Sequence, residues 1–96
     1  MKSMRKLLTT GSQIFPVDYR AGDCTINVTP TASTYTAEFT VNNVWDTSIT
    51  PRWAPITDMT AATTAQTKGI EAPITAVRVT VNAGASVEVN LVQGSV

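Results

Sequence analysis

The stretch that decides the fold is residues 77–91, VRVTVNAGASVEVNL. Valine or leucine alternates with other residues on both sides of a central Ala-Gly-Ala, and this period of two is typical of strands with one buried and one solvated face. Glycine adopts positive φ without a steric penalty, so Gly84 suits the tip of a three-residue turn. The pattern therefore predicts a β-hairpin in which Val79 lies opposite Val89.

Four segments upstream also have strand character. In residues 35–41, apolar side chains alternate with threonine and glutamate, and residues 25–29 form a shorter candidate. Within residues 14–19, Pro16 lacks the backbone donor that a central strand needs, which predicts an edge strand or a bulge. Residues 49–56 contain two prolines and predict an irregular strand.

The composition supports the same fold class, because threonine occurs 17 times and valine 11 times among 96 residues. β-branched side chains fit a pleated sheet better than a helix, which predicts an all-β protein. We expect a single antiparallel β-sandwich, jelly-roll or immunoglobulin-like, with about seven or eight strands. The sandwich should span residues 13–96, with a surface loop at residues 57–69. Residues 1–12, basic and then briefly apolar, should form an N-terminal arm.

The residue counts exclude several kinds of catalytic and metal site. The chain has no histidine and one cysteine, so its own residues cannot supply a Ser-His-Asp triad, a histidine zinc site or an internal disulfide. The carboxylates show no spacing that distinguishes them from ordinary surface acids. We therefore expect no enzyme activity, no cofactor and no metal, and we expect Cys24 to be a small core residue.

Charge bears on the partners and on the cellular compartment. Seven Lys and Arg balance seven Asp and Glu, so no long-range field would attract nucleic acid or an acidic membrane. The basic start precedes an apolar run of only Leu7-Leu8, much shorter than the roughly 7–15 residues of a signal peptide. We therefore expect synthesis in a reducing cytosol. Arg78 and Glu88, diagonal neighbours in the predicted hairpin, should stabilise the fold only slightly.

Large aromatic side chains mark the other candidate surface. Exposed tryptophans are frequent in sugar-binding platforms and protein interfaces. Trp53 is a better surface candidate than Trp45, because Arg52 and two prolines flank it.

Three stretches carry a resemblance to a known class of protein: WAPITDMT at 53–60, IEAPITAVRVTVNAG at 70–84 and VNLVQG at 89–94. Together they resemble small bacteriophage virion proteins, in which a Phe-x-Val strand precedes a tryptophan, a Thr/Ala-rich loop and a glycine-turned final pair of strands. The resemblance extends from Tyr35 to the C-terminus. The matching positions are Phe39, Thr40, Val41, Trp53, Pro73, Ala76, Arg78 and Gly84.

The resemblance implies a structural component of a phage particle, made in the host bacterial cytoplasm and located in the virion. We expect a capsid decoration or cement protein that contacts copies of itself and a major capsid protein, with residues 1–8 lying on the capsid or on an adjacent subunit. A tail, collar or fibre-adaptor subunit is the alternative. The candidate interface residues are Met4, Arg5, Leu7, Leu8, Arg52 and Trp53.

A function of a different class is a carbohydrate-binding module displayed on the particle. It would stack host glycans on Trp45, Trp53 or Tyr35. The only observation that supports this alternative is the presence of these aromatic residues.

Overall fold

The computed structural model describes residues 2–17, 24–42, 44, 47–70 and 74–93. Those residues form one six-stranded antiparallel sheet, and the all-β prediction is confirmed. Within the same ranges no helix could span a membrane. The strands are β1 (Lys2–Leu8), β2 (Gly11–Pro16), β3 (Cys24–Thr40), β4 (Ala54–Pro55), β5 (Gln66–Ile70) and β6 (Ala76–Gln93).

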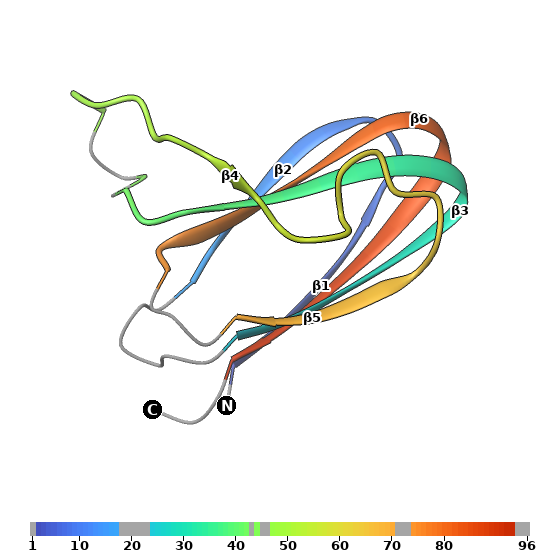
Figure 1. Cartoon of the computed structure of the whole chain (residues 1–96), viewed down its shortest axis with the longest axis horizontal. Helices are drawn as coiled ribbons and strands as arrows, with labels where there is room; N and C mark the ends of the chain where they lie inside the picture. Colours follow the sequence, from blue (N-terminus) through green and yellow to red (C-terminus); the bar gives the residue numbers. More distant parts are fainter. Residues whose placement is uncertain (1, 18–23, 43, 45–46, 71–73, 94–96) are drawn as a thin grey trace.

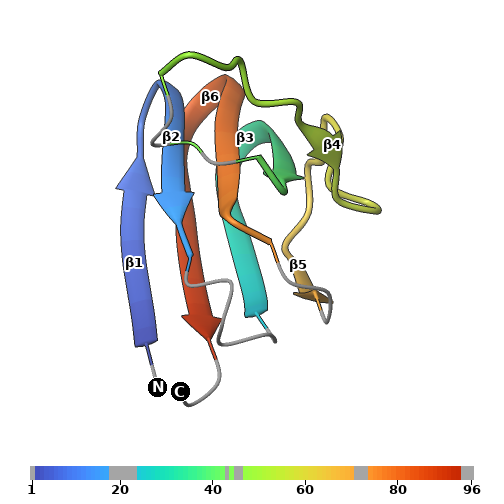
Figure 2. The same ribbon diagram turned by 90° about the vertical axis from the view of Figure 1, so that its left-hand side faces the viewer.

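The sheet is built on its two longest strands. β3 has 17 residues and β6 has 18, and they pair from Cys24 opposite Gln93 to Thr40 opposite Ala76. The other side of β6 pairs with β2 near its beginning and with β1 near its end. Beyond β3, β5 pairs with the start of that strand and β4 with its end. β3 and β6 curve together (Figure 1), and β1 and β2 lie at one margin of the sheet (Figure 2).

Both long strands bend near their midpoints (Figure 1). Gly84 has a φ of 110° and Ala32 a φ of 48°, in the region that L side chains rarely adopt. Gly84 lies opposite Ser33, and a Cβ atom on Gly84 would lie 2.3 Å from the carbonyl oxygen of Ala32. The register also shifts by one residue between Thr34 and Tyr35, which is a β-bulge. We call this bend the crease and define it by Ala32, Ser33 and Gly84.

Apolar side chains on the inner face of the bent sheet form one core cluster. In β6 the buried residues keep odd numbers across the crease: Val77, Val79, Val87, Val89 and Leu91. In β3 the buried apolar residues change from even to odd numbers at the crease: Cys24, Ile26, Val28, Tyr35 and Ala37. This change offsets the extra residue that the bulge adds to β6. Both strands therefore keep their apolar side chains on the inner face.

The predicted hairpin at residues 77–91 is wrong, because β6 continues through Gly84 as one bent strand. Val79 lies opposite Ala37, and Val89 lies opposite Val28. The alternation is the same in a hairpin and in a bent strand, since both put the valines on one face. The period of two therefore predicts the buried face correctly and leaves the pairing partner undetermined.

The predicted N-terminal arm at residues 1–12 is not confirmed. Lys2–Leu8 instead pair with β6 as β1, and Gly11–Pro16 pair with β6 as β2. Leu8 is 5% exposed in the core, and Met4 packs against the same cluster. Three basic residues in a short segment indicated a solvated arm, yet an edge strand also solvates long charged side chains.

The two-layered sandwich of seven or eight strands is not confirmed either. The strands belong to a single open sheet of six, and residues on both sides of the crease contribute to one core. Two strands predicted separately, at 25–29 and 35–41, are parts of β3. Because the long strands bend, the two halves of the sheet on either side of the crease both direct apolar side chains into one core. The second half of the bent sheet thus takes the place that a second sheet has in a sandwich.

Three predictions for the remaining segments have mixed outcomes. Pro16 ends β2, and among the described strands β2 pairs only with β6, so the edge-strand prediction is confirmed. Residues 57–69 contain no helical turn, but their last part lies in β5. Within residues 49–56, Ala54 and Pro55 pair with β3.

Candidate functional site

The feature of this sheet best suited to a partner is its margin along β1 and β2 (Figure 2). Both strands pair with β6, and no other strand in the described part of the chain pairs with their outer side. In an antiparallel strand with one neighbour, every second residue directs its N–H and C=O groups away from that neighbour. We call this surface, formed by Lys2–Leu8 and Gly11–Pro16, the β1–β2 margin.

Exposed apolar side chains are concentrated along this margin. Leu7 is 62% exposed and Ile14 is 42% exposed. Leu7 lies opposite Glu88 and Ile14 opposite Arg78, so both side chains lie on the outer face of the sheet. Val92, 40% exposed, lies on the neighbouring strand β6. Three of the five large apolar side chains that are exposed in the described ranges thus lie at or beside the margin.

The same margin carries two basic side chains with different surroundings. Arg5 Nε donates to Glu88 Oε1 at 2.5 Å, and the Arg5 side chain is 75% exposed. Lys6 lies opposite Val89 and is exposed, with no ion pair to any residue in the described ranges. Because the Arg5 pair is open to water, it adds little to the stability of the fold. The margin therefore presents one loosely held cation and one unpaired cation.

The six predicted interface residues do not form one surface. Arg5 and Leu7 are exposed on β1, whereas Leu8 is buried and Met4 is half-buried against the core. Arg52 and Trp53 precede β4, at the other end of the strand order. Four of the six thus lie on β1, and two of these, Arg5 and Leu7, are exposed at the β1–β2 margin. Lys6 and Ile14 are also exposed at this margin and were not among the six predicted residues, because their position there depends on the strand order.

Trp53 forms a compact cluster on the outer face. The Arg78 guanidinium carbon lies 4.5 Å from the centroid of the Trp53 ring, a cation–π contact. Arg78 also donates from Nη2 at 2.8 Å and from Nε at 3.2 Å to Glu38 Oε1, directly across from it on β3. The predicted Arg78–Glu88 pair is therefore wrong, because each residue pairs with a different strand. The cluster attaches the segment before β4 to the sheet.

The other aromatic and thiol candidates lie inside the molecule or outside the described residues. Tyr35 is fully buried, and its hydroxyl donates to the Thr64 carbonyl at 3.0 Å, so it offers no stacking face to a glycan. Burial raises the pKa of Tyr35 above its ordinary value. Cys24 is 1% exposed, which confirms the predicted core position, and burial raises the pKa of its thiol to about 11. Trp45 lies outside the described residues.

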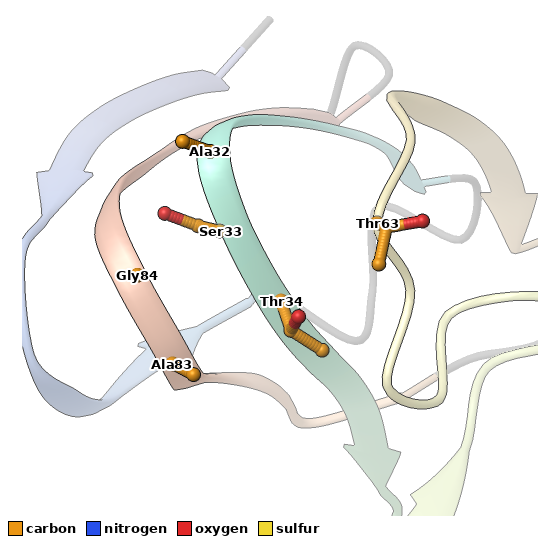
Figure 3. A pocket seen from close by; sticks show the side chains of 6 residues that line it. All are labelled: Ala32, Ser33, Thr34, Thr63, Ala83 and Gly84. Carbon is orange, nitrogen blue, oxygen red and sulfur yellow. The ribbon is translucent and has the colours of Figure 1, made fainter.

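A hollow of about 310 Å³ lies at the crease (Figure 3), lined by Ala32, Ser33, Thr34, Thr63, Ala83 and Gly84. The Ser33 hydroxyl donates to the Thr31 carbonyl at 2.8 Å and accepts from the Ser86 N–H at 2.9 Å. The first bond lies within β3 and the second joins β6 to β3, so the hydroxyl stabilises the bend. The hollow is therefore a product of the crease, lined by small side chains.

Among the described residues, no three acidic or cysteine side chains are placed to hold a metal ion.

Comparisons of the chain with protein-family models, with curated protein sequences and with solved structures found no significant match.

Proposed function

We propose that this protein is a non-enzymatic structural subunit of a bacteriophage particle that decorates or cements the capsid surface. The setting in a virion rests on the sequence resemblance described above. The β1–β2 margin is the observation that carries the role of a subunit. A tail, collar or fibre-adaptor subunit would do the same work at another place on the particle.

The open margin supports this role through its backbone and its side chains. Unpaired N–H and C=O groups along two strands are a template for another chain. Leu7 and Ile14 add apolar area, and burial of such area contributes about 25 cal/mol per Å². A domain of 96 residues has a small core, so contacts with neighbouring subunits add substantially to its stability.

The ionic contacts of the sheet fit the same role. Arg5 pairs with Glu88, Arg78 with Glu38 and Lys68 with Asp58, and each pair joins two different strands or a strand and a loop. The charged side chains of these pairs thus lie between neighbouring segments of the sheet rather than converge on one cavity. Such a scaffold suits a protein whose work is to contact other proteins.

Reconstitution on particles tests the proposal. Purified protein is mixed with phage particles assembled without it, and capsids and tails are then separated by sedimentation. We expect saturable binding to capsids, with an unrelated 10 kDa protein as the negative control. Binding to tails alone would replace the capsid assignment by the tail alternative. Binding to neither fraction would contradict the proposal.

A further inference from the structure

We propose that the β1–β2 margin binds an extended acidic segment of the capsid protein, which adds to the sheet as a further strand. This inference rests on the proposed function and names the chemistry of the partner. The margin offers two successive strands, of 7 and 6 residues, along one side of β6. Main-chain hydrogen bonds would give such a complex its affinity, and the side chains would select the partner.

The apolar side chains distinguish this margin from an edge that is merely protected. Natural proteins often guard a free edge with charged residues, and Arg5 and Lys6 match that pattern. A purely protective edge, however, gains nothing from apolar side chains at the surface. Leu7 and Ile14 are exposed on the outer face, one on each strand of the margin. A strand added along β1 would cover Leu7 with every second side chain, and its continuation along β2 would cover Ile14 in the register of that strand.

The charges disfavour a second copy of β1 as the occupant. Antiparallel pairing of two β1 strands over their full length places Arg5 opposite Arg5 of the second copy and Met4 opposite Lys6 of the second copy. Like charges directly opposite each other destabilise a strand pair. The β5 margin of a second copy is no better suited, because Gln66–Ile70 contains Lys68 and no acidic residue.

Charge complementarity therefore favours a partner strand with carboxylates. Lys6 is exposed and unpaired with any described acid, and Arg5 is shared only with Glu88 at the surface. Lys6 lies opposite Val89 on the inner face, whereas Arg5 and Leu7 lie on the outer face, so carboxylates at every second position of the partner would lie opposite or diagonal to Lys6. Apolar residues at the intervening positions would face outward and cover Leu7.

Labelled peptides test this proposal on the isolated protein by fluorescence anisotropy. The probe is a short peptide in which glutamate alternates with valine. One control replaces glutamate by lysine, and another carries N-methyl groups on alternate backbone nitrogens, which block strand addition. We expect only the unmodified glutamate peptide to bind, and we expect added salt to weaken its binding. Equal binding of the lysine peptide or the methylated peptide would overturn the proposal.

Matched variants locate the binding surface. Lys6→Glu should weaken binding of the glutamate peptide about tenfold, whereas Arg52→Glu, the same charge reversal at an exposed residue near β4, should not. Leu7→Ser should also weaken binding. Val41→Ser should not, although Val41 is 66% exposed and Leu7 is 62% exposed. Thermal unfolding verifies that all four variants fold. Equal effects within either matched pair would place the peptide elsewhere and overturn the proposal.

The particle assay separates this inference from the proposed function. If Lys6→Glu binds capsids as well as the parent does, the acidic-strand proposal is wrong while the capsid role stands. If the parent binds the glutamate peptide at the margin but binds no capsid, the capsid protein is not the partner and the inference is wrong in that respect. A dimer of the parent that Lys6→Glu alters would identify a second copy as the occupant.

Discussion

Gly84 lies directly opposite Ser33, and a Cβ atom at position 84 would lie 2.4 Å from the Ser33 Cα and 2.6 Å from its hydroxyl oxygen. The close approach and the φ of 110° are independent reasons for glycine at this position. The crease therefore depends on one residue in the central strand of the sheet.

Replacing this glycine should destabilise the protein strongly. Gly84→Ala adds a Cβ atom against the backbone of β3 and forces a side chain into an unfavourable φ, so we expect a loss of about 2–4 kcal/mol in the free energy of unfolding. Urea denaturation measures it. Gly69→Ala is the matched control, because a Cβ atom at Gly69 has no neighbour within 4 Å, and its effect should stay within about 0.5 kcal/mol. If the two variants were equally stable, a side chain at position 84 would not strain the crease, and this prediction would be wrong.

Disulfide trapping tests whether β6 is a bent strand or a hairpin. Asn27 lies opposite Asn90 on the outer face, so Asn27→Cys with Asn90→Cys should form a disulfide under mild oxidation. Arg78→Cys with Asn90→Cys should not, although those positions face each other in a hairpin centred on Gly84. Mass spectrometry of unreduced protein distinguishes the two results, and Cys24 stays buried and unreactive. The reverse outcome would restore the hairpin.

Alkaline pH should lower the stability of the protein in a defined window. Burial raises the pKa of Cys24 from 9.0 to about 11, so the unfolded chain loses the thiol proton at a lower pH than the folded protein does. The stabilisation is complete below pH 9.0 and is lost as the pH rises towards about 11. Tyr35, whose pKa is also raised, adds to the loss at higher pH. Urea denaturation at a series of pH values should show a smaller decline for Cys24→Ala than for the parent. Parallel declines would exclude Cys24 as a cause.

The cluster around Trp53 should matter more than the exposed ion pair of β1. Arg78→Met removes the cation–π contact and the bond to Glu38, and we expect a loss of about 1 kcal/mol. Arg5→Met removes a pair whose arginine is 75% exposed, and we expect about 0.3 kcal/mol or less. Urea denaturation measures both losses, and a shift in Trp53 emission in a Trp45→Phe background reports the loss of the Arg78 contact. If Arg5→Met lowered the free energy of unfolding more than Arg78→Met does, the prediction that the Trp53 cluster matters more would be wrong.

The sequence predicts the faces of the strands better than their partners. Alternation in 77–91 identifies the buried valines, and Pro16 identifies an edge strand, because both signals are local. The path through Gly84 could not be predicted, since a turn and a bend need the same glycine. The Arg78–Glu38 pair and the exposed position of Lys6 at the margin depend on the strand order, which short stretches of sequence do not reveal. Residues 66–70 were missed because their pattern resembles a loop.

The position of β6 in the sheet also constrains how the protein folds. β1, β2 and most of β3 pair with β6, yet β6 is the last described strand to be synthesised. Lys2 pairs with Gln93, so the earliest strand has no partner in its own sheet until the latest has been made. Long-range contacts of this kind slow folding, and they leave unpaired strand edges exposed meanwhile. Until β6 has been synthesised, β1 therefore has no strand partner in the described sheet.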